Sequence, residues 1–171
     1  MVRLFIGVLL PEDLKDNAIT IQHNIKKFVD AKFVERENLH ISLSFLGDTD
    51  ENEIGGIKEK LDQICSRYKN FEVKIGQLKF IPSENFLRVI ALDSESDQLK
   101  MLSKEIKKEI GGDVKPPHLT LCRVRKVLDK EKLLHSKTAE FVFAVTSASL
   151  IKSVVSRNGP TYTSLHDSHF G

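Results

Sequence analysis

The sequence is poor in cysteine and has almost no net charge. Its two cysteines, Cys65 and Cys122, are too few for a disulfide framework and do not have the spacing of a metal site. With 26 basic and 24 acidic side chains, the formal net charge is +2. Binding of a polyanion therefore requires a local concentration of positive charge. The sequence also lacks the aromatic-rich signature of RNA-recognition domains, so base-specific binding is not expected.

Long apolar runs are also absent. The run before Pro11 is shorter than the apolar region of a signal peptide and has no small-residue cleavage site after it. No segment approaches the roughly 20 apolar residues of a membrane span. We therefore expect a cytoplasmic protein without membrane association, in which this run is a buried first strand. The 171 residues fit one domain, covering 1–171.

The apolar pattern alternates between strand-like and helix-like segments. Helices are expected after Pro11 and over 51–68 and 96–110, with a short one near 129–137. The expected strands are 3–10, 31–35, 39–46, 71–80 with a bulge at Gly76-Gln77, 86–92, 119–127, 140–156 and 161–166.

This order indicates an internal duplication. A strand, a helix and a strand that begins at His40 are followed by a second such set, whose last strand begins at His118, 78 positions later. Two similar lobes would then face each other across a pseudo-twofold axis.

The two strands that begin with histidine have the same alternation. In His40-Ile41-Ser42-Leu43 the imidazole and the hydroxyl share one face of a strand and the aliphatic side chains share the other, and His118-Leu119-Thr120-Leu121 repeats this with threonine. A lone strand histidine is usually structural. Two such tetrads, separated by about half the chain, are hard to attribute to chance.

Paired imidazoles suit phosphodiester chemistry. Because imidazole titrates near pH ~6.5, one ring can accept a proton from water while the other donates one to a departing ribose oxygen. Hydroxyl groups and cations stabilise the charge on the phosphorus oxygens. This scheme uses no metal and no cofactor.

The paired tetrads resemble the signature of the LigT-like two-histidine phosphoesterases, the family of 2'-5' RNA ligases and RNA 2',3'-cyclic phosphodiesterases. The resemblance covers essentially the whole chain. The segments that carry it are 3–7, 38–43 running into 45–47, 117–121 with Arg123, and a closing hairpin with Gly159-Pro160 and Tyr162.

The resemblance implies an α/β fold of the α+β type: two duplicated lobes of antiparallel β-sheet, flanked by helices, around a central cleft. It implies hydrolysis of RNA 2',3'-cyclic phosphates to 2'-phosphomonoesters and reversible 2'-5' joining of RNA ends. By position, His40 is the proton donor and His118 the proton acceptor, whereas Ser42, Thr120 and Arg123 bind the phosphate. The expected partners are RNA ends or small cyclic-phosphate nucleotides, bound by a monomer.

Two residues after the second tetrad are less simple to place. Strict alternation sets Arg123 on the face opposite His118 and Thr120, so either the strand twists or bulges after Leu121 or Arg123 is a structural or entrance cation. Cys122 would share the face of His118. At about 13 Å along a strand, it cannot form a dyad with His118, and a buried or cleft-lining thiol is expected.

The remaining histidines give no sign of a second site. His166 and His169 have no metal-site partner at a recognised spacing, and His23 and His135 are expected on the surface. The basic residues that begin at Arg123 are candidates for the RNA path. The alternatives are an RNA-end or nucleotide-binding module without turnover, and a phosphodiesterase acting on a small cyclic nucleotide.

Overall fold

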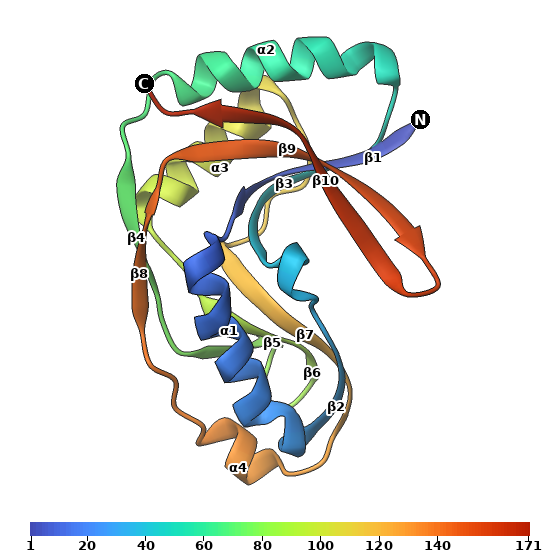
Figure 1. Cartoon of the computed structure of the whole chain (residues 1–171), viewed down its shortest axis with the longest axis vertical. Helices are drawn as coiled ribbons and strands as arrows, with labels where there is room; N and C mark the ends of the chain where they lie inside the picture. The colour runs from blue at the N-terminus through green and yellow to red at the C-terminus, as the bar shows by residue number, and fades with distance from the viewer.

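A computed structural model describes all residues from 1 to 171 and shows a mixed α/β fold with ten strands and four α-helices (Figure 1). The strands are β1 (Val2–Leu9), β2 (Val29–Phe33), β3 (His40–Thr49), β4 (Phe71–Ile75), β5 (Leu78–Pro82), β6 (Leu87–Asp93), β7 (His118–Val127), β8 (Phe141–Val145), β9 (Ser147–Ser156) and β10 (Gly159–His169). The α-helices are α1 (Glu12–Ile25), α2 (Ile54–Cys65), α3 (Asp97–Glu109) and α4 (Lys130–Leu134), and short 3₁₀ helices cover Lys26–Phe28, Arg36–Asn38 and Glu51–Glu53.

All strand pairs are antiparallel, and they form two sheets of unequal size. The large sheet has eight strands in the order β10-β9-β1-β3-β7-β6-β5, with β2 paired to β7, and the small sheet is the pair β4-β8. Helices flank both sheets (Figure 1). The expected α+β class with two antiparallel sheets is confirmed. The duplication into two lobes remains a prediction.

The two histidine strands meet at the centre of the large sheet. β3 and β7 share a single register pair, Ile41 with Leu119, and both side chains are fully buried. On the same edge of β7, β2 takes over the pairing further along the strand, and β6 pairs with the opposite edge. β3 and β7 therefore touch only where the tetrads lie and then separate.

Two of the helices pack against strands from the other half of the chain. α1, which follows β1, packs against β7, whereas α3, which precedes β7, packs against β3. One cluster of 30 buried, mostly aliphatic residues extends through both halves of the chain. The histidine strands are therefore held by a shared core. None of the helices combines the length and the apolar character that a membrane crossing requires.

The chain changes sheets at two places where a single strand was expected. At Gly76-Gln77 the chain leaves β4, in the small sheet, and enters β5, in the large one, so the predicted bulge there is wrong. Backbone hydrogen bonds from Gly76 and to Gln77 tie this crossing to Asp93. The expected strand 140–156 is likewise divided into β8 and β9, which belong to different sheets. The local sequence pattern does not reveal such a change of sheet, because the change is defined by the remote strands with which each segment pairs.

Helix α2 is shorter than expected. The predicted range 51–68 begins with a 3₁₀ turn, capped by Asp50 and Glu53 in a reciprocal capping box, and α-helix covers only Ile54–Cys65. Two glycines in its first turn weaken the helix there.

Both histidine strands carry a β-bulge three residues after the histidine. In β3, Ile6 faces Ser44 and Gly7 faces Ser42, so Leu43 has no partner on β1. In β7, Ile90 faces Cys122 and Ala91 faces Thr120, so Leu121 has no partner on β6. An extra residue in one strand reverses the alternation of the side chains beyond it.

The loop that follows α3 holds the bulged part of β3. Ser44 Oγ donates to the Gly111 carbonyl at 2.8 Å, and Phe45 and Asp113 exchange two backbone hydrogen bonds of 2.9 Å. The backbone reaches this position through Gly111 and Gly112, whose φ angles are +114° and +98°. A Cβ on Gly112 would overlap Ser44 Oγ and lie 2.8 Å from the Phe45 carbonyl, whereas a Cβ on Gly111 would meet nothing.

Replacement of these two glycines by alanine separates backbone strain from the clash. G111A should lower the free energy of unfolding by about 1–3 kcal/mol, because alanine is strained at positive φ. G112A should lower it by at least about 1 kcal/mol more, because its methyl group also displaces β3. Urea unfolding followed by circular dichroism measures both. Equal losses in the two variants would show that the contact with β3 is unimportant.

Candidate active site

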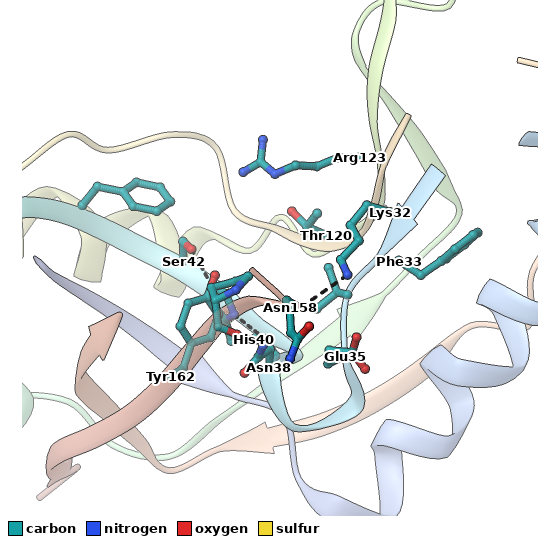
Figure 2. A pocket seen from close by; sticks show the side chains of 13 residues that line it. Lys32, Phe33, Glu35, Asn38, His40, Ser42, Thr120, Arg123, Asn158 and Tyr162 are labelled. Atoms are coloured by element: carbon teal, nitrogen blue, oxygen red, sulfur yellow. Dashed lines mark hydrogen bonds between the residues drawn. The ribbon is translucent and has the colours of Figure 1, made fainter. Parts of the chain in front are cut away.

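A cavity lies beside the tetrads, between the segment that joins β2 to β3, the bulged part of β7 and the tip of the β9–β10 hairpin (Figure 2). Three hydrogen-bonding side chains of the tetrads line it: His40, Ser42 and Thr120. The other lining residues are Lys32, Phe33, Val34, Glu35, Asn38, Phe45, Arg123, Asn158, Pro160 and Tyr162.

The first tetrad has the predicted alternation. Ile41 and Leu43 are fully buried, whereas His40 and Ser42 are half-buried at the cavity. His40 Nδ1 lies 2.7 Å from the Asn38 carbonyl oxygen, which can only accept, so this nitrogen carries a proton. Nε2 lies 2.8 Å from Ser42 Oγ. The nitrogen that faces the cavity is therefore the one free to lose or gain a proton.

The second tetrad repeats this arrangement. Leu119 and Leu121 are fully buried, and His118 and Thr120 are half-buried. His118 Nδ1 lies 2.8 Å from the Pro116 carbonyl oxygen, again two residues before the histidine. Both imidazoles thus have the same nitrogen anchored to the backbone and Nε2 left for chemistry.

His118 is not part of the cavity lining, but it is close enough to His40 for its charge to lower the pKa of that imidazole. The antiparallel pair Ile41–Leu119 places the neighbouring positions opposite each other, His40 with Thr120 and Ser42 with His118. The structure therefore brings the four predicted tetrad residues together around the single contact between β3 and β7.

The bulges determine which residues follow the tetrads into the cavity. Beyond Leu121, Cys122 is turned into the core and Arg123 to the cavity face, together with Thr120. The bulge in β3 has the same effect, since Ser44 is buried and Phe45, 46% exposed, lines the cavity. The structure thus places Arg123 on the cavity face, which is the alternative that required a bulge in the strand.

The carbonyl group of Leu121 is held from two sides. It accepts hydrogen bonds from the Val34 amide at 2.9 Å and from Gln22 Nε2, on α1, at 3.0 Å. Gln22 is buried and also donates to the Val34 carbonyl at 3.0 Å. A buried carbonyl without these donors would be costly, so α1 stabilises the bulge that exposes Arg123.

Cys122 corrects the sequence prediction in one respect. It is fully buried, as a structural thiol should be, but it does not share a face with His118 because the bulge comes between them. Burial raises the pKa of the Cys122 thiol to about 12. The thiol is therefore protonated at neutral pH and unsuited to nucleophilic attack.

Aromatic rings enclose the His40 imidazole. The ring of Phe5 lies 4.8 Å from it, and that of Tyr162 meets it edge-on at 5.3 Å and 87°. This burial lowers the pKa of His40 below the ordinary 6.5; hydrogen bonding to the Asn38 carbonyl opposes the shift, and the charge of His118 adds to it. His40 is therefore more readily neutral in the ligand-free protein than an exposed histidine.

Sequence analysis missed several residues of the site. Tyr162 and Asn38 entered only as parts of segments that carry the family resemblance, and Lys32 and Gln22 were not singled out. Asn38 Nδ2 donates to the Pro160 carbonyl at 2.9 Å and thereby attaches the hairpin tip to the segment before β3. The last contact joins residues 122 positions apart, and no local pattern signals it.

The other histidines have different surroundings. His166 Nε2 lies 2.7 Å from Asp62 Oδ1, to which Ser168 Oγ also donates at 2.6 Å, so this pair joins α2 to β10. His23 on α1 and His135 after α4 are both exposed, as predicted, and lie outside the cavity lining.

Comparison with known proteins identifies relatives along the whole chain. The family model described as LigT like Phosphoesterase matches residues 8–91. A protein of Methanocaldococcus jannaschii named RNA 2',3'-cyclic phosphodiesterase is 33% identical, with 94% of this chain and 96% of that protein covered. A protein of the same name from Aquifex aeolicus is 30% identical, with 100% and 98% covered.

Solved structures share the fold. A Thermus thermophilus protein superimposes with a TM-score of 0.84 at 21% identity, covering 98% of this chain and 97% of that one. Apo LigT of Escherichia coli superimposes with a TM-score of 0.76 at 21% identity, covering 99% and 97%.

The enclosure of His40 leads to a prediction about its titration. In buffer without phosphate, His40 should titrate below 6.5, because burial disfavours the imidazolium. H118A should raise the pKa of His40, because it removes a like charge, whereas H135A should leave it unchanged. Long-range ¹H–¹⁵N correlation spectra recorded against pH measure this. A His40 pKa at or above 6.5 would contradict the assigned environment.

Proposed function

The chain belongs to the LigT-like phosphoesterase family, and we propose that it is an RNA 2',3'-cyclic phosphodiesterase that hydrolyses the cyclic phosphate to a 2'-phosphomonoester. The observation that carries the proposal is the equivalent mounting of His40 and His118. Each has Nδ1 anchored to a backbone carbonyl, which leaves Nε2 on the same face of the sheet for proton transfer. The relatives named above support the choice of a cyclic phosphate as substrate.

In the proposed reaction, water attacks phosphorus and the bond between phosphorus and the ribose O3' breaks. Neutral His118 accepts a proton from the water, and protonated His40 donates one to O3', which leaves as a hydroxyl group. The phosphate stays on O2'. After the displacement His118 carries the proton taken from water and His40 is neutral, so His118 must release a proton and His40 must take one up before the next turnover.

Ser42, Thr120 and Arg123 are proposed to bind the non-bridging oxygens. Each hydroxyl belongs to the residue two positions after the histidine of its strand. Arg123 adds a guanidinium that can contact two oxygens at once. Negative charge grows on these oxygens as water attacks, so fixed donors stabilise the transition state more than the substrate. Phe45, exposed at the cavity, offers a surface for the terminal base.

Substrate binding is proposed to counteract the lowered pKa of His40, the residue that acts as the acid. The neutral form is favoured in the free protein, but a bound phosphodiester places negative charge beside the ring and raises the pKa again. His40 is therefore proposed to take up its proton as substrate binds. The hydrogen bond from Nδ1 to the Asn38 carbonyl supports the charged form in the same way.

The same displacement serves the predicted joining of RNA ends. If the 5'-hydroxyl of a second RNA replaces water, attack on the cyclic phosphate breaks the same bond to O3' and leaves a 2'-5' linkage. No further catalytic group is needed, and in the reverse direction the histidines exchange roles. The cytoplasmic location and the monomeric state remain predictions.

Hydrolysis should depend on both histidines. With an oligonucleotide that ends in a 2',3'-cyclic phosphate, in EDTA, the wild type should give a 2'-phosphate end. H40A and H118A should each lower kcat by about 10²- to 10⁴-fold, because each removes one proton-transfer group. Separation of the products by anion exchange identifies the 2'-phosphate.

H23A is the matched control, because this exposed histidine of α1 lies outside the cavity lining, and it should retain wild-type activity. Full activity in H40A or H118A would remove that histidine from the chemistry, and a 3'-phosphate product would reject the bond assignment. Binding of the oligonucleotide without any product would favour a binding module.

A further inference from the structure

Two cations of the cavity wall are cross-strand neighbours, and neither of them forms an ion pair. Lys32 on β2 and Arg123 on β7 are direct partners in the antiparallel register. Both line the cavity, and neither takes part in an ion pair. Like charges directly opposite each other on neighbouring strands are destabilising, so this pair costs stability in the ligand-free protein.

Another basic residue of the same two strands is compensated. Arg125 Nη1 lies 3.7 Å from Asp30 Oδ1, and Asp30 is also the register partner of Lys126. Asp30 thus serves the outer part of the two strands, whereas Lys32 and Arg123, at the cavity, have no ion-pair partner. An anionic ligand would relieve the repulsion between them.

The two side chains point to different parts of the cavity. Figure 2 shows the Arg123 guanidinium on the side of Ser42 and Thr120, whereas the Lys32 side chain points toward Asn158 at the tip of the β9–β10 hairpin. Lys32 Nζ lies 3.5 Å from the Asn158 carbonyl oxygen, a long contact that leaves its other hydrogens free. One anion beside the histidines would therefore occupy Arg123 and leave Lys32 unused.

We propose that Lys32 binds the phosphodiester on the 5' side of the terminal nucleotide and thereby makes the site prefer RNA ends to cyclic mononucleotides. A nucleoside 2',3'-cyclic phosphate has one anionic group, whereas an RNA end has a second one nucleotide away. The inference rests on the proposed function and narrows its substrate class. Lys32 acts in binding, not in the displacement.

Glu35 restricts the path of the RNA. It lines the same wall without an ion pair and repels phosphate groups on its side of the cavity. The upstream phosphodiester is therefore placed between Lys32 and the hairpin tip. Gly159 lies at this point, and a Cβ there would stand 3.9 Å from Lys32 Nζ, an ordinary van der Waals distance, so the hairpin tip borders the amine directly.

The test compares two substrates that differ in the second phosphate: adenosine 2',3'-cyclic phosphate and the dinucleotide ApA with a 2',3'-cyclic phosphate end. K32M keeps the aliphatic chain and removes the charge. It should lower kcat/KM for the dinucleotide by about tenfold, mainly through KM, because one charge-assisted contact is lost. For the mononucleotide the change should stay below about twofold.

K32R and K69M are the controls. K32R should keep most of the preference for the dinucleotide, since the charge is retained, and K69M, at an exposed lysine between α2 and β4 outside the cavity lining, should behave as the wild type. Equal losses on both substrates in K32M, or no loss on either, would overturn the proposal.

A binding measurement separates this proposal from the proposed function. The same proteins are titrated calorimetrically with adenosine 2'-monophosphate and with ApA that carries a 2'-phosphate. A weaker affinity of K32M for the dinucleotide alone supports the Lys32 subsite even if the wild type shows no turnover, which would refute only the enzymatic activity. Unchanged affinity for both ligands would refute the subsite.

Discussion

The β-bulge that follows each tetrad, at Leu43 in β3 and at Leu121 in β7, is the constraint on which the cavity depends. Each tetrad alternates as an ordinary strand does, which fixes His40 with Ser42 and His118 with Thr120 on one face. The bulge then reverses the alternation, so that Phe45 and Arg123 join that same face. Without the bulges, an aromatic ring and a guanidinium would point into the apolar core.

The rest of the fold keeps these bulges in place. The carbonyl of Leu121 accepts hydrogen bonds from α1 and from the segment after β2, and the bulged part of β3 is paired with the loop after α3. Because α1 packs on β7 and α3 on β3, each half of the chain supports the histidine strand of the other. β3 and β7 separate after one shared pair, and the cavity occupies the side where they part.

The sequence was enough to predict the tetrads, because alternation is a local property and a burial pattern of period two has one structural solution. It also predicted the fold class and the positions of most strands and helices. Arg123 could not be placed, since the bulge depends on hydrogen bonds from Gln22 and Val34, which are remote in the sequence. For the same reason Cys122 was assigned to the wrong face. The change of sheet at Gly76-Gln77 looks like a bulge locally, because only the partner strands, β8 and β6, distinguish the two.

The most direct test of the account is a crystal structure of the protein with adenosine 2'-monophosphate, the product of the smallest cyclic substrate. The phosphate should lie between the Nε2 atoms of His40 and His118, each at about 2.7–3.2 Å from a phosphate oxygen. The guanidinium of Arg123 should contact the same phosphate. A phosphate bound elsewhere, or one reached by the histidines while Arg123 lies on the opposite face of β7, would contradict the account.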